Sequence, residues 1–477
     1  MTKCKADLKG SPKPTPDVAK KNKIPEVKPR IFDFKEDGTR VMAKFFRKVG
    51  FVVVRCLTEK QCDEQILSQY EHINLKTPWK VQTAIKDPAD PGVPVESLEV
   101  QTVDPAKGPQ KRVLIRRTLD FKNKLDRSKL LSELTKPNLS NEELKHLEDT
   151  ACFHLGFGAP CSPGSFHTKA LWKIRQRPSL HALAKQIIGE EELWVDYNRS
   201  IQKLPTQGDA EFLHWDIPYL HMEWTKTKAI GGKVAFTPTE FICVPGTNTK
   251  EMHERIVEAY RPLYPNAKAT DAKFQLDEAK SDPLKLRDSR VAIQVPRGCA
   301  IFWDAKLLHG VRANGRKNPI QFGMYLGYFA AGSREEYKKN AKVDEREDRR
   351  LSFVTGLPPD LFPSFDRVHV YPFRHMNYIV MVEKNAAKTR DDYPGLTTRI
   401  VGSGKRKGEE VPHFEFVADP EYTAPELTLL GKRLAGLEKW PGEEDPSLKK
   451  KIKISGEMTR KRVLEEEEKS DAKRQRV

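Results

Sequence analysis

The decapeptide EFLHWDIPYL, residues 211–220, sets an imidazole and a carboxylate two positions apart among aromatic and aliphatic side chains. His214 and Asp216 offer a nitrogen and an oxygen ligand, which suit several transition metals. A His-x-Asp triplet alone is more often a surface turn or a hydrogen-bonded pair. The metal interpretation therefore depends on a third ligand and on a scaffold that brings it close.

A suitable third ligand lies 95 residues further on, in the segment RGCAIFWDAKLLHG, residues 297–310. His309 follows an apolar run that is typical of a buried strand. Two imidazoles and one carboxylate on neighbouring strands can occupy one face of an octahedral ion and leave three positions open, as in non-haem Fe(II) oxygenases. Zn(II) is compatible with the same three side chains.

An oxidising centre of this kind needs apolar walls that keep water out. The aromatic residues next to the proposed ligands, Trp215, Phe302 and Trp303, are candidates for such walls. Plain core packing explains each of them at least as well, so their role stays open at this point.

The elements that must position the ligands follow a simple order along the chain. Helical patterns come first: Thr58 and Gln61 form a capping box, and Gly189 ends a helix that contains SLHALAKQII. After Gly189 the apolar period changes to that of strands. We expect strands at residues 193–198, 234–244, 291–295, 300–304 and 320–329.

Helices followed by many short strands predict a mixed α+β fold that is mainly β, a double-stranded β-helix of the jelly-roll or cupin type braced by N-terminal helices. We expect a disordered basic arm at residues 1–30, the β-helix domain at 31–400 and a charged, mostly disordered tail at 401–477. The core strands should fall at about 193–330 and a helical insertion at about 248–290, while residues 76–120 look like loops.

The net charge of +17 invites a nucleic-acid interpretation. The first 30 residues hold nine Lys or Arg against three acidic residues, but the last 77 hold seventeen against sixteen. Four basic clusters in the tail resemble nuclear-import signals, although a solubilising tail explains them equally well. We expect a small-molecule or acyl substrate, with nucleic acid or protein left open as a substrate.

The seven cysteines form no CxxC pair and no regular ladder. This pattern is typical of reduced thiols and indicates a cytoplasmic or nuclear protein. No run approaches the roughly 18 apolar residues of a membrane span, and the basic N-terminus lacks the apolar core of a signal peptide.

Three motifs, LHWDIPY, the strand that ends in VPGT at residues 244–247, and RGCAIFWDAKLLHGVRAN, resemble the iron-ligand regions of the phytanoyl-CoA dioxygenase-like family. The resemblance covers roughly residues 45–385. It implies a double-stranded β-helix that uses Fe(II), 2-oxoglutarate and O2. It also implies that His214, Asp216 and His309 are the iron ligands. Asn314 fits an asparagine that the family carries shortly after the distal histidine, and we expect it to contribute to binding 2-oxoglutarate.

The chain departs from the family at one position. The family places a basic residue, usually an arginine, about ten positions after the distal histidine to bind the far carboxylate of 2-oxoglutarate, and a guanidinium fork suits that carboxylate. Here the position falls at Pro319. Arg316 or Lys317 would serve if the hairpin is shorter, and Arg312 and Arg199 are alternative donors.

The resemblance implies a hydroxylase that converts 2-oxoglutarate to succinate and CO2. Two other classes stay open on the sequence. The chain could be a catalytically silent β-helix that binds partners through its basic tails. The absence of an arginine at the expected position for 2-oxoglutarate supports this alternative. It could also be a zinc-dependent cupin-like enzyme that uses the same ligands.

Overall fold

The computed structural model describes the central part of the chain and several shorter segments. The described ranges are 30–76, 80–82, 95–104, 108–117, 124–141, 166–197, 200–205, 212–268, 274–312, 314–331, 345–356, 361–363, 370–372, 396–400, 410–414 and 422–441. The predicted disorder of the basic arm and of most of the tail lies outside these residues. None of the helices in the described ranges combines the length and apolar character needed to cross a bilayer.

The larger sheet has eight strands in the order β1-β2-β13-β9-β15-β7, with β16 pairing both β9 and β6. Apart from the parallel β1–β2 pair, the neighbours are antiparallel. The strands are β1 (Ile31–Asp33), β2 (Phe51–Arg55), β6 (Leu193–Val195), β7 (Ser200–Lys203), β9 (Ala229–Ala235), β13 (Cys299–Asp304), β15 (Gln321–Tyr325) and β16 (Tyr328–Ala330).

The smaller sheet has five antiparallel strands in the order β11-β8-β14-β10-β12. They are β8 (Phe212–Trp215), β10 (Thr239–Val244), β11 (Phe274–Gln275), β12 (Val291–Val295) and β14 (Leu308–Val311). Two connections pass from one sheet to the other over short turns, β9 to β10 and β12 to β13.

Alternation along the strands divides the apolar side chains into three layers, because successive residues point to opposite faces of a sheet. One layer lies between the sheets and contains Phe51, Ile301 and Trp303 from the larger sheet together with Phe241 and Ile293 from the smaller one. The other two layers cover the outer faces of the sheets. Two facing sheets joined in this way are a double-stranded β-helix, and the predicted fold class is confirmed.

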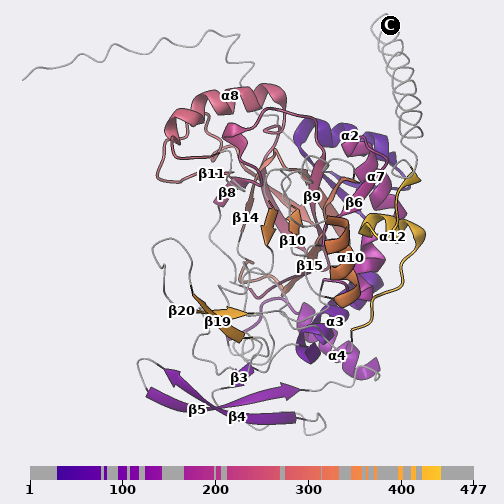
Figure 1. Cartoon of the computed structure of the whole chain (residues 1–477), viewed down its shortest axis with the longest axis vertical. Helices are drawn as coiled ribbons and strands as arrows, with labels where there is room; N and C mark the ends of the chain where they lie inside the picture. The colour runs from indigo at the N-terminus through magenta and orange to yellow at the C-terminus, as the bar shows by residue number, and fades with distance from the viewer. Residues whose placement is uncertain are drawn as a thin grey trace, which may run out of the picture.

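Helices cover both outer faces. Helices α2, α3, α6 and α7 pack on the larger sheet, whereas α8 covers the smaller one, and Figure 1 shows α8 across the strands from α2 and α7. The helices are α2 (Gly38–Val49), α3 (Glu59–Lys76), α4 (Lys124–Thr135), α6 (Lys169–Arg175), α7 (Pro178–Ile188), α8 (Lys250–Tyr260), α10 (Glu345–Thr355) and α12 (Leu429–Ala435), with 3-10 turns η1 (Tyr219–His221) and η2 (Arg261–Leu263).

Local sequence signals set several helix ends. The capping box is formed, with Thr58 N donating to Gln61 Oε1 at 3.0 Å and Gln61 N donating to Thr58 Oγ1 at 3.3 Å. Gly189 ends α7 with a φ of 80°, a left-handed conformation that glycine adopts without strain. Helix α8 falls inside the predicted insertion at 248–290.

The expectation of loops over residues 76–120 is wrong. These residues contain β3 (Lys80–Gln82), β4 (Val95–Asp104) and β5 (Gly108–Arg117), which form a three-stranded antiparallel sheet. Two further strand pairs lie later in the chain: β17 (Leu361–Pro363) with β18 (Val370–Pro372), and β19 (Leu396–Ile400) with β20 (Glu410–Phe414).

Residues 422–441 are an exception to the mostly disordered tail that the sequence predicts. Helix α12 packs beside β6, and Leu434, Ala435 and Trp440 are buried. The buried Arg349 of α10 joins the two elements, because its guanidinium donates to Ala435 O at 2.9 Å and to Val195 O at 2.6 Å. This part of the tail therefore belongs to the folded domain.

We predict that Arg349→Met lowers the free energy of unfolding by about 3 kcal/mol, because buried carbonyl groups lose their donor. Urea denaturation followed by tryptophan fluorescence measures the change. The neighbouring Arg350 is exposed and pairs with Glu347, so Arg350→Met should leave the midpoint unchanged. Equal midpoints for the two variants would contradict the role given to Arg349.

Candidate metal centre

The end of strand β8 aims two polar groups into the layer between the sheets. Leu213 and Trp215 belong to the outer layer under α8. His214 lies between them in the strand and therefore points the opposite way, toward the larger sheet. Asp216 directly follows the strand and returns to the same side as His214.

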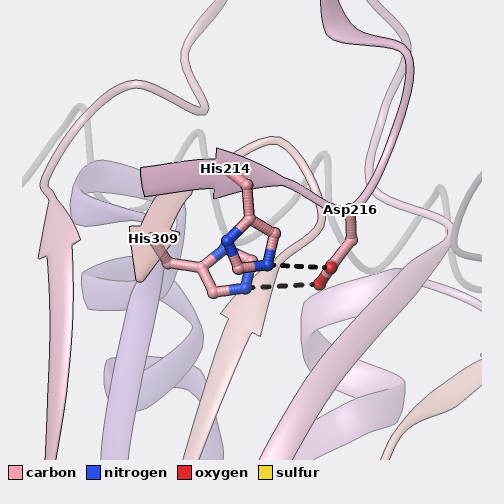
Figure 2. Close-up of side chains that lie close together, drawn as sticks. All are labelled: His214, Asp216 and His309. Atoms are coloured by element: carbon pink, nitrogen blue, oxygen red, sulfur yellow. Dashed lines mark ion pairs between the residues drawn. The ribbon is translucent and has the colours of Figure 1, made fainter. Parts of the chain in front are cut away.

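Strand pairing supplies the third group. In the antiparallel pairing of β14 with β8, His309 lies directly opposite His214, and the two ring centroids are 4.4 Å apart. Figure 2 shows the three side chains converging, with both imidazoles directed at the Asp216 carboxylate. The predicted ligands, 95 residues apart in the sequence, are thus brought together by one register.

The geometry suits a metal ion. His214 Nε2 lies 3.4 Å from Asp216 Oδ1, and His309 Nε2 lies 3.4 Å from Asp216 Oδ2. One ligand atom from each of the three residues lies within 4.8 Å of the others. Ligands about 2.1 Å from an ion and at right angles lie roughly 3 Å apart, so a small inward shift would place all three on one face of an octahedral Fe(II).

The hydrogen bonding of His309 prepares it for this role. Its Nδ1 lies 3.0 Å from the carbonyl oxygen of Leu307, a contact in which Nδ1–H donates. This contact fixes the ring orientation and leaves Nε2 as the nitrogen available to a metal ion. This nitrogen faces the Asp216 carboxylate, so an ion bound between them would contact both.

The Asp216 carboxylate is held in its charged form. Burial alone would raise its pKa, but the imidazoles of His309 and His214 hold the pKa of Asp216 well below its usual value. Trp303 adds a donor, with Nε1 at 3.4 Å from Asp216 Oδ2. A carboxylate that keeps its charge near two imidazoles is a good ligand for a divalent cation.

Gly231 of β9 makes room for this tryptophan. A Cβ atom at Gly231 would lie 2.6 Å from Trp303 Cε2, which no real contact tolerates. The indole therefore reaches Asp216 only because the neighbouring strand carries no side chain here.

Two aromatic rings flank the ligands on the inner side. The Phe241 ring stacks on His309 at 5.7 Å, and Trp303 lies 5.4 Å from His309. Of the expected wall residues, only Trp303 has this position: Trp215 packs with Phe274 under α8, and Phe302 faces the helices on the larger sheet. Period-two alternation could have separated them, because Trp215 and Phe302 each lie one position from an inward-facing residue.

The basic residues proposed for 2-oxoglutarate lie elsewhere. Arg316 is exposed and its guanidinium donates to Leu139 O and to Asn141 Oδ1. Lys317 is also exposed. Arg312 pairs with Glu240, on the outer surface. The structure does not bring these three side chains to the ligands, and Arg199 lies outside the described residues.

Asn314 has a structural position. It is buried, and its Nδ2 donates to Pro319 O at 2.8 Å and to Lys203 O at 3.2 Å. These bonds shape the turn between β14 and β15. Its assignment to 2-oxoglutarate stays a prediction that these contacts do not favour.

A polar group that the sequence analysis missed lies on the same inner layer. Lys233 of β9 reaches across to the smaller sheet, where its Nζ donates to Thr239 Oγ1 at 2.7 Å. Gln321, the first residue of β15, bonds the same hydroxyl. The signal available was a single lysine inside the apolar strand AIGGKVA.

Comparison with known proteins places the chain. The family model for phytanoyl-CoA dioxygenase (PhyH) matches residues 46–316, more than half of the chain. The chain belongs to the phytanoyl-CoA dioxygenase family. A search of curated proteins found no match.

Solved structures similar to the chain include enzymes of varied activity. The non-heme alpha ketoglutarate dependent epimerase SnoN from nogalamycin biosynthesis is 13% identical, with 61% of this chain and 83% of that chain covered and a TM-score of 0.32. EctD from S. alaskensis, in its apoform, is 15% identical over 61% and 77% of the two chains, with a TM-score of 0.31. The non-heme monooxygenase ThoJ, as a nickel complex, is 13% identical over 61% and 77%, with a TM-score of 0.31.

Membership of this family defines the class of chemistry. This phytanoyl-CoA dioxygenase family member is an Fe(II)- and 2-oxoglutarate-dependent dioxygenase that uses O2. The donor set of two imidazoles and one carboxylate fits that iron, since it leaves half of the coordination sphere for other groups.

We predict that Trp303→Phe weakens divalent metal binding about tenfold, because Asp216 loses a donor that orients it. A titration with Mn(II), followed by electron paramagnetic resonance, measures the affinity. Trp215→Phe is the matched control, since that indole faces away from the ligands and bonds Lys306 O. Equal affinities in both variants would exclude an orienting role for Trp303.

Proposed function

We propose that this dioxygenase hydroxylates a C–H bond of a small-molecule or acyl substrate, with His214, Asp216 and His309 as the three protein ligands of Fe(II). One O2 and one 2-oxoglutarate are consumed for each hydroxyl group formed, and succinate and CO2 are released. The convergence of two Nε2 atoms and one carboxylate on a single point supports this proposal most directly.

The protein residues orient and shield. Ferrous iron, when bound, supplies the oxidation that couples 2-oxoglutarate decarboxylation to substrate hydroxylation. His309 is oriented by Leu307 O, and Asp216 is oriented by Trp303. The Asp216 side chain is 24% exposed, against 9% for His214 and 5% for His309, so the group is recessed and still accessible.

The apolar surround limits competing reactions. Phe241 and Trp303 cover the inner side of the ligand group and keep bulk water from it. Exclusion of water protects a strong oxidant from side reactions. We therefore expect tight coupling between substrate oxidation and 2-oxoglutarate consumption.

Compartment and targets are part of the proposal. The described thiols of Cys56, Cys62, Cys243 and Cys299 are all free and buried, which agrees with a cytoplasmic or nuclear protein. The basic clusters of the tail, which raised a nucleic-acid or protein substrate as an alternative, lie outside the described residues.

We predict that His309→Ala lowers succinate formation by more than about 100-fold. Loss of a ligand costs more than loss of a group that merely orients one. The measurement uses purified protein with Fe(II), ascorbate and 2-oxoglutarate, and follows the slow succinate release that occurs without substrate. Bound iron is determined in the same samples.

His221→Ala is the matched histidine control, because His221 is exposed at the end of η1. It should keep both iron and turnover. Full turnover in the His309→Ala chain would refute the ligand assignment. Activity restored by zinc without O2 would replace the proposal by the zinc-dependent alternative.

A further inference from the structure

The polar end of the layer between the sheets carries groups that the iron ligands do not use. We propose that Lys233, assisted by Thr239, Gln321 and Lys203, binds the distal carboxylate of 2-oxoglutarate in place of the arginine that the family usually provides. This inference rests on the proposed function and deepens it, since it names the residues that select the co-substrate.

The strand pattern directs Lys233 inward. Gly232 and Val234 face the helices, where a Cβ at Gly232 would meet Phe302. Ala235 lies in the layer between the sheets, and so does Trp303, whose indole fits over Gly231. Lys233 shares the parity of Gly231 and Ala235, so its ammonium group points into the β-helix.

The hydrogen bonds leave donors available. Lys233 Nζ uses one of its three N–H groups on Thr239 Oγ1, at 2.7 Å. The Thr239 hydroxyl accepts this bond and a second from Gln321 Nε2, which leaves its own proton to donate. A lysine is a point charge rather than a fork, and the hydroxyl beside it would supply the second hydrogen bond to a carboxylate.

The charge at this end of the layer favours an anion. Lys203 pairs in register with Gln321 on the neighbouring strand and is 4% exposed. Burial, together with the Lys203 ammonium, lowers the pKa of Lys233 to about 7. Within the described residues Lys203 is the one charged group that shifts this pKa, and a carboxylate bound at Lys233 would favour the charged ammonium.

The separation from the iron ligands suits the co-substrate. Phe241, whose ring stacks on His309, lies two residues after Thr239 on β10. Along the strand, Thr239 is roughly 7 Å from Phe241 and roughly 13 Å from Cys243, the cross-strand partner of His309, and the His309 ring lies against the Phe241 ring. The chain of 2-oxoglutarate, roughly 5 Å long, together with the bonds at its two ends can bridge the part between the Phe241 ring and Thr239. The keto-acid end can therefore reach the metal while the far carboxylate meets Lys233. Lys233 itself remains partly exposed, so the site can be reached.

Anaerobic calorimetry on the Fe(II)-loaded protein tests the assignment with two probes. 2-Oxoglutarate carries the distal carboxylate, whereas 2-oxobutyrate has the same keto-acid end, is one carbon shorter and lacks that carboxylate. We predict that Lys233→Met weakens 2-oxoglutarate binding roughly 10- to 150-fold, the range expected for losing a hydrogen bond to a charged group. Binding of 2-oxobutyrate and of Fe(II) should be unchanged.

Lys317→Met is the matched control, since Lys317 is exposed, and it should bind 2-oxoglutarate like the wild type. Unchanged 2-oxoglutarate binding by Lys233→Met, or equal losses for both probes, would overturn the assignment. A wild-type protein that binds neither probe nor iron would instead refute the proposed function.

A second measurement uses the wild-type chain and does not depend on the folding of a variant. Acetic anhydride should acetylate Lys233, and mass spectrometry of the peptides gives the rate. 2-Oxoglutarate should slow this acetylation at least about tenfold, because an ammonium group bonded to a carboxylate must break that charge-assisted bond before it reacts. 2-Oxobutyrate should not slow it. The same rate with and without 2-oxoglutarate would overturn the assignment.

Discussion

The register between β8 and β14 is the constraint on which the rest of the site depends. Because His214 and His309 are direct cross-strand partners on one face, their imidazoles are adjacent whatever the loops around them do. A slip of one residue would turn one imidazole to the outer face, under α8. The buried layers on both sides of the small sheet oppose such a slip, since they would have to exchange apolar for polar side chains.

The same alternation gives the inner layer two chemically different regions. Around His309 it is aromatic, with Phe241 and Trp303 beside the ligands. Toward the start of β10, at Thr239, the inner layer becomes polar and cationic. A molecule with a chelating end and a charged end is complementary to these two regions, and this complementarity is the basis of the proposed co-substrate site.

The fold class and the convergence of His214, Asp216 and His309 could be predicted because they depend on local period and on a motif with few alternatives. The strands of residues 95–117 were missed because their turn residues and charges outweigh a weak alternation. The basic residues predicted for 2-oxoglutarate were chosen by a different criterion. That criterion was distance along the chain from His309, and it gave Arg316, which is exposed in the structure. Lys233, a cation on the inner layer, comes from another strand. Pairing between distant strands cannot be derived from spacing alone.

Anomalous X-ray diffraction at the iron edge, from crystals loaded anaerobically with Fe(II), tests the central claim most directly. The account predicts one iron peak about 2.1 Å from His214 Nε2, His309 Nε2 and an Asp216 oxygen, with no other protein ligand. Iron bound elsewhere, or a fourth protein ligand that closes the coordination sphere, would contradict it.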